Sequence, residues 1–138
     1  RPEGGFGHAS ELASYLREHF PFDLGGACYP ENHPESKTSA DDLHFTRHKV
    51  ACGVSFLTTQ LFFDNGDYFG FVSRARRGGI EVPIVPGIMP ITNVSQIERF
   101  TSLCGARIPA ELKARLDRVR EDPGAVMALG VEHAILQC

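Results

Sequence analysis

Three short segments of the chain carry residue types that are unusual for their surroundings and could contact a ligand. Residues 29–37 carry His33, and residues 86–90 read Pro-Gly-Ile-Met-Pro. Between them, Gln60 places an amide in an otherwise apolar stretch. An amide offers a ligand both a donor and an acceptor, although a core glutamine bonded to neighbouring backbone is the alternative. The glycine of the third segment suits close approach of backbone to a flat ligand, or an ordinary turn.

Other arrangements of reactive residues are weaker. His33 and Glu35 form an acid–base pair or simply belong to a loop. His44 and His48 have the i, i+4 spacing of metal ligands, but without an HExxH motif we interpret them as solvated helix residues. The glycine-rich residues 4–7 do not follow a strand, so they do not fit a dinucleotide-binding fingerprint. We therefore assign no catalytic residue and no metal ligand.

The elements that must position these segments alternate along the chain. Apolar and β-branched runs predict strands over 23–28, 54–63 and 82–85, and the second is nearly continuous in apolar character, as in a strand buried on both faces. Helix periodicity and capping residues predict helices at these positions: from Ala9 to before Pro21, from Thr38 or Ser39 to Cys52 with Gly53 as the cap, over 67–77, from Asn93 to Cys104 with Gly105 as the stop, and after Pro109 and Asp122.

This rhythm of strand and helix predicts parallel βα units. A complete (β/α)8 barrel needs about 250 residues, so the 138 residues, with three predicted strands, supply only part of one. A small doubly wound domain is the alternative. In both architectures the carboxyl ends of the strands share one rim, which brings the three loop segments together.

Composition restricts the classes of function. With 42% hydrophobic and 22% charged residues, the chain is expected to be a soluble globular domain. A net charge of −3 without a basic cluster argues against nucleic acid and anionic membranes as partners. Four widely spaced cysteines indicate reduced packing thiols and a cytoplasmic location. Because the chain starts at Arg1 rather than Met and ends abruptly at Cys138, we expect a piece of a longer protein.

Taken together, the segments resemble the methylenetetrahydrofolate reductase family. The resemblance is carried by Tyr29-Pro30-x-x-His33-Pro34-Glu35, then by residues 59–64 (Thr-Gln-Leu-Phe-Phe-Asp) and residues 86–90, in the family's order and spacing. It implies that residues 1–138 are one partial domain, about three strands of an FAD-binding (β/α)8 TIM barrel. The implied activity is reduction of methylenetetrahydrofolate to methyltetrahydrofolate with NADH or NADPH, in one-carbon metabolism and methionine biosynthesis, with a homo-oligomer expected.

The resemblance also implies roles for individual residues. Five match cofactor-binding positions of the family: Ala9, Tyr29, His33, Asp42 and Lys49. Three match positions used for folate or nicotinamide: Gln60, Gln96 and Phe100. A cationic Lys49 suits an anionic cofactor, and Phe100 suits stacking on a flat ligand or packing in the core. We carry over no contact for Phe45 and His48.

The family's catalytic glutamate falls before Arg1, so the resemblance implies much of a flavin cradle and part of a folate site without the proton donor. Two other interpretations stay open. One is a non-catalytic barrel fragment without bound flavin, and the other is an unrelated small α/β ligand-binding domain.

Overall fold

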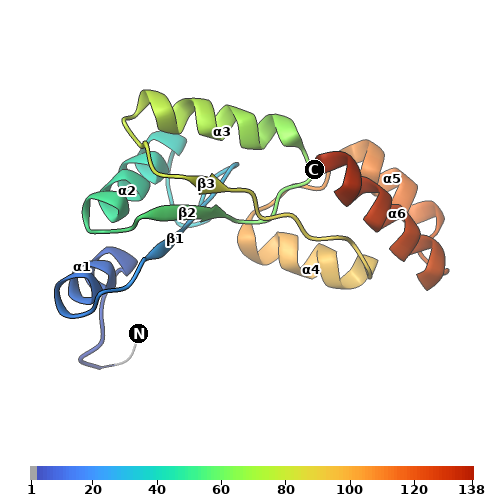
Figure 1. Cartoon of the computed structure of the whole chain (residues 1–138). Coiled ribbons are helices and arrows are strands. Elements are labelled where there is room, and N and C mark those ends of the chain that lie inside the picture. The colour runs from blue at the N-terminus through green and yellow to red at the C-terminus, as the bar shows by residue number, and fades with distance from the viewer. Residues whose placement is uncertain (1–2) are drawn as a thin grey trace.

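A computed structural model describes residues 3–138, in which six helices alternate with, and then follow, three strands. The elements are α1 (Ala9–His19), β1 (Gly25–Cys28), α2 (Ser39–Ala51), β2 (Phe56–Thr59), α3 (Asn65–Arg77), β3 (Ile84–Val85), α4 (Val94–Cys104), α5 (Ala110–Arg118) and α6 (Pro123–Gln137) (Figure 1). The strands form one parallel sheet in the order β1-β2-β3. The predicted α/β class, with parallel βα units from part of a (β/α)8 barrel, is confirmed.

The sheet is covered on one face only. On that face Cys28, Leu57 and Ile84 are 0%, 0% and 9% exposed. On the opposite face, a row of neighbouring strand residues is exposed: Ala27, Thr58 and Val85. The prediction that the second strand is buried on both faces is therefore wrong, because no other element among residues 3–138 covers this side. A sheet with one exposed face is expected of a section of barrel wall, because the face that would point into the barrel lacks the strands opposite it.

The second strand is also shorter than the predicted 54–63. The backbone N–H of Gln60 still donates to the Cys28 carbonyl of β1 at 2.7 Å. The next N–H, that of Leu61, instead donates to the Gln60 side-chain oxygen at 2.9 Å. The Gln60 side chain thereby replaces a strand partner, and the ladder ends there. Phe62 and Phe63 then leave the sheet as buried loop residues.

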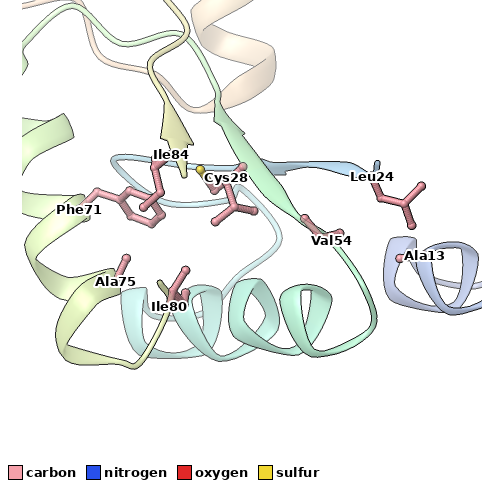
Figure 2. Packing of buried hydrophobic residues seen from close by; sticks show 9 residues of the cluster. Ala13, Leu24, Cys28, Val54, Phe71, Ala75, Ile80 and Ile84 are labelled. Carbon is pink, nitrogen blue, oxygen red and sulfur yellow. The ribbon is translucent and has the colours of Figure 1, made fainter. Parts of the chain in front are cut away.

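The first core lies between the sheet and its flanking helices. Leu57 and Ile80 are fully buried there, with Phe71 and Ala75 of α3. Figure 2 shows Phe71, Ala75 and Ile80 gathered beneath the strand residues Cys28 and Ile84. Helix α3 thus turns Phe71 and Ala75 toward the sheet.

A second core joins the last three helices. Ile97 of α4, Leu112 and Leu116 of α5 and Val126 of α6 pack with Ile91. In Figure 1 these helices lie beyond the carboxyl ends of β2 and β3, whereas α2 and α3 run alongside the strands. The chain thus places a group of helices next to the rim where the predicted ligand-binding loops emerge.

Side-chain caps fix where the helices begin. The Thr38, Asn93 and Asp122 side chains accept hydrogen bonds from the first turns of α2, α4 and α6, as predicted. Helix α3 begins at Asn65 rather than 67, because Asp64 accepts from the Gly66 N–H. Gly105 ends α4 in the left-handed conformation with φ +74°, as the predicted stop requires.

Candidate cofactor and substrate site

Four of the five predicted cofactor-binding residues line one cavity of about 650 Å³. Ala9 comes from the start of α1, His33 from the loop after β1, and Asp42 and Lys49 from α2. These residues are up to 40 positions apart in the sequence, so the fold brings them together. Their convergence makes this cavity the leading ligand site of the chain.

The α2 helix supplies two charges that burial makes costly. Asp42 is 7% exposed, and burial raises the pKa of its carboxyl although Lys49 and His33 act to lower it. Burial likewise lowers the pKa of the half-buried Lys49 ammonium, although Asp42 acts to raise it. For both groups, therefore, desolvation outweighs the attraction between them.

The Lys49 ammonium bonds to the backbone and, within the described residues, forms no ion pair with a carboxylate. Its Nζ donates to the carbonyl oxygen of Ala27 in β1, and none of the ion pairs within 4.0 Å among residues 3–138 includes it. Asp42 receives a long hydrogen bond of 3.4 Å from the Ser36 hydroxyl. A partly desolvated ammonium that lines a cavity without a carboxylate partner is suited to an anionic ligand such as a phosphate.

The loop after β1 orients the two aromatic candidates. The Glu35 N–H donates to Nδ1 of His33 at 3.1 Å, so a neutral His33 ring carries its proton on Nε2 and can donate it to a ligand. Tyr29 packs edge-on against His33, with ring centroids 4.5 Å apart. Tyr29 does not line the cavity itself, and burial, with the nearby Asp42 charge, raises the pKa of its hydroxyl.

The predicted substrate residues lie in other places. Gln96 and Phe100 of α4 line a second cavity of about 320 Å³ together with residues of the 89–93 loop. Phe100 is 38% exposed, whereas Ile97 on the same helix is 3% exposed, so the core is filled by Ile97 and not by Phe100. Gln60 lines neither cavity, and its side-chain oxygen accepts from the Leu61 N–H.

The glycine of the Pro-Gly-Ile-Met-Pro segment has a structural reason. A Cβ added to Gly87 would lie 2.3 Å from the Thr59 carbonyl oxygen, and the Gly87 N–H donates to the Thr59 hydroxyl at 2.8 Å. The backbone approach is therefore to the end of β2, as expected of an ordinary turn. These contacts account for the glycine without a ligand.

Sequence reasoning missed part of the cavity lining. Phe45 and His48 line it beside Lys49, and so do residues 7–11 at the start of α1. Phe45 is 57% exposed. Its position four residues before Lys49 places both side chains on one face of the helix, and this spacing could have indicated Phe45 as a lining residue. Within residues 3–138 no three histidine, cysteine or acidic side chains are grouped to hold a metal ion. No described helix is long and apolar enough to cross a membrane.

Comparison with known proteins gives a consistent match. The family model for methylenetetrahydrofolate reductase matches residues 1–138. The chain is 37% identical to methylenetetrahydrofolate reductase (NADH) 1 of Arabidopsis thaliana, over 99% of this chain and 25% of that protein. It is also 37% identical to 5,10-methylenetetrahydrofolate reductase of Escherichia coli, over 93% of this chain and 43% of that protein. The chain thus spans less than half of the length of each of these two relatives.

A solved structure shares the fold. An uncharacterized protein from Clostridium thermocellum, described as binding two copies of 5-methyl-5,6,7,8-tetrahydrofolic acid, matches with a TM-score of 0.58. The match covers 89% of this chain and 46% of that one at 17% identity. At that identity the likeness concerns the fold alone.

Proposed function

Because this chain belongs to the methylenetetrahydrofolate reductase family, we propose that it forms part of an enzyme that reduces methylenetetrahydrofolate to methyltetrahydrofolate. In this proposal, residues 1–138 are a portion of one flavin-binding barrel domain, FAD is the cofactor and NADH or NADPH is the hydride donor. The observation that carries the proposal is the family match over the whole chain, with four of the five predicted cofactor residues around one cavity.

The cavity fits a flavin nucleotide in its chemistry. Lys49 would bind the anionic part of the cofactor, because its ammonium lacks a carboxylate partner among the described residues. His33 would donate through Nε2, and Asp42 would accept from cofactor hydroxyls while balancing the Lys49 charge. Bound FAD supplies the hydride-transfer chemistry that side chains lack.

We assign the folate side of the site to α4 and to the end of β2. Phe100 exposes a flat ring beside Gln96, which suits a ligand with an aromatic ring system. Gln60 would bind the pterin of folate. Its side-chain oxygen would then give up the hydrogen bond from the Leu61 N–H and turn toward the ligand. Because that hydrogen bond joins adjacent residues, a rotation of the Gln60 side chain is enough to break it.

We also propose that the protein assembles as a homo-oligomer. Helix α6 buries Val126, Gly130 and Ala134. It leaves a stripe of large apolar residues exposed on another side: Met127 at 51%, Val131 at 40% and Ile135 at 67%. A helix that is apolar on more than one side normally contacts further protein.

Titration of the purified chain with FAD tests the proposal. Quenching of flavin fluorescence should report saturable binding, and Lys49→Ala should weaken it at least tenfold because an ammonium–phosphate contact is lost. Lys113→Ala is the matched control, since Lys113 lies on α5 with exposed partners Glu98 and Asp117. Equal affinity in wild type and Lys49→Ala, or no binding by the wild type, would contradict the assigned cradle and support a fragment without flavin.

A further inference from the structure

Arg107, in the loop between α4 and α5, joins three segments that are far apart in the sequence. Its backbone N–H donates to both carboxylate oxygens of Glu31, at 3.1 and 2.8 Å. Its guanidinium donates to Asp67 in the first turn of α3 at 2.9 Å and lies 3.8 Å from Asp64. Glu31 and Arg107 are 76 positions apart, so this contact links the loop after β1 directly to the loop after α4. We call it the Glu31–Arg107 clasp.

The clasp is partly shielded from water. The Glu31 side chain is 19% exposed, and burial raises the pKa of its carboxyl although the Arg107 backbone and charge lower it. The Arg107 side chain is 56% exposed, so the guanidinium adds little to stability by itself. A half-desolvated carboxylate held chiefly by a backbone N–H is a weak stabilising device. Its position, rather than its strength, is therefore the feature to explain.

Neighbouring contacts show how closely the two loops approach. A Cβ added to Gly105 would lie 3.3 Å from Cγ of Pro34. On the other side, the Asn32 amide donates to the carbonyl oxygens of His33 and Ser36, at 3.2 and 3.1 Å. Arg74 of α3 donates to the Pro30 carbonyl at 3.0 Å. The loop that carries Tyr29 and His33 is thus tied internally, to α3 and to the end of α4.

We propose that Glu31 and Arg107 are positioning residues that hold α4, with Gln96 and Phe100, in a fixed relation to the flavin-binding loop. The inference rests on the proposed function for the identity of the two ligands. In a site where a second flat ligand must approach the cofactor, displacement of α4 would impair binding of that ligand far more than binding of the cofactor. The clasp therefore contributes to folate affinity without touching either ligand.

The first test separates the two affinities. FAD is titrated by flavin fluorescence, and methyltetrahydrofolate is titrated by calorimetry into the FAD-saturated chain. Glu31→Ala removes the carboxylate that accepts from the Arg107 backbone N–H. It should raise the Kd for methyltetrahydrofolate about tenfold and change the Kd for FAD less than twofold, and Glu31→Gln should recover part of the loss because its side-chain oxygen can still accept. Glu81→Ala, which replaces an exposed glutamate, is the control. Unchanged folate affinity in Glu31→Ala, or an equal loss in Glu81→Ala, would overturn the proposal.

The second test needs no ligand. Amide hydrogen exchange of the free chain should accelerate in residues 31–36 and 105–109 together in Glu31→Ala, and Glu81→Ala, which replaces an exposed glutamate, should leave both segments unchanged. If exchange in 105–109 is unaltered, the clasp does not couple the loops and the inference fails even when FAD binds. If the wild type binds neither ligand, the proposed function of this chain fails, and the coupling is decided by exchange alone.

Discussion

Lys49 and Asp42 carry charges whose burial lowers the stability of the fold. Both charges sit on α2 in positions where desolvation opposes ionisation, and neither removes the penalty of the other. Apolar residues at the two positions would avoid this cost. The location of both charges beside a cavity is therefore physical support for a ligand that restores favourable surroundings to the lysine.

Cys28, the last residue of β1, should make the free energy of unfolding depend on pH in the alkaline range. Burial raises the pKa of its thiol from 9.0 to about 12, so the folded chain keeps a proton that the unfolded chain loses. Stability from this residue is fully present below pH 9.0 and is lost as the pH rises toward 12. Urea unfolding should show this as a fall of up to about 1.4 kcal/mol per pH unit.

Two cysteine variants isolate the effect. Cys28→Ala should abolish that part of the pH dependence, because the remaining alkaline groups are common to both proteins. Cys138→Ala removes an exposed thiol and should keep the wild-type slope. An identical slope in wild type and Cys28→Ala would show that Cys28 ionises equally in both states.

For single residues, the sequence predicted roles that depend on nearby residues better than roles that depend on the rest of the fold. Thr38 and Asn93 could be recognised as caps because a cap depends on residues three positions away. The local role of the Gln60 oxygen could not, because it depends on where the strand ladder ends. Of the four thiols expected to pack in the interior, Cys28 is fully buried, whereas Cys138 is exposed.

Among elements, the end of β2 depends on the close approach of Gly87. Gly87→Ala should lower the free energy of unfolding by about 1–3 kcal/mol, because the new methyl group would overlap the Thr59 carbonyl. Gly70→Ala in α3 is the contrast, since its Cβ would meet only the end of the Arg74 side chain at 3.4 Å. That variant should be stabilised by up to about 1 kcal/mol. Chemical denaturation measures both, and equal effects would refute the close-packing argument.

Element boundaries could be predicted only where local chemistry sets them. The start of α4 and its stop at Gly105 follow from the cap and from a positive φ, both properties of a few adjacent residues. The predicted 54–63 strand was too long, because apolar character continues into Phe62 and Phe63 after the strand has ended. Burial in a loop and burial in a sheet produce the same apolar run.

At the scale of the whole molecule, residues of α1 and α2 line the cavity beside Lys49, and residues of α4 line the cavity beside Gln96 and Phe100. Contacts over 76 positions, such as the Glu31–Arg107 clasp, relate the two regions. No periodicity or local motif indicates a contact of that length. The family resemblance singled out four residues that line one cavity, because it carries information about the geometry of a complete fold. Their shared ligand stays a prediction.

The most direct test of the account is backbone amide NMR of the labelled chain during FAD titration. Bound FAD should cause the largest shift changes in residues 7–11, 33–36 and 42–49, which include the lining of the cavity beside Lys49. A separate cavity of about 590 Å³ is lined by Ser14, Arg17, Glu18 and residues 50–55, and the resonances of these residues should move far less. Shift changes centred on residues 50–55, or no saturable changes at all, would contradict the assignment of the flavin site.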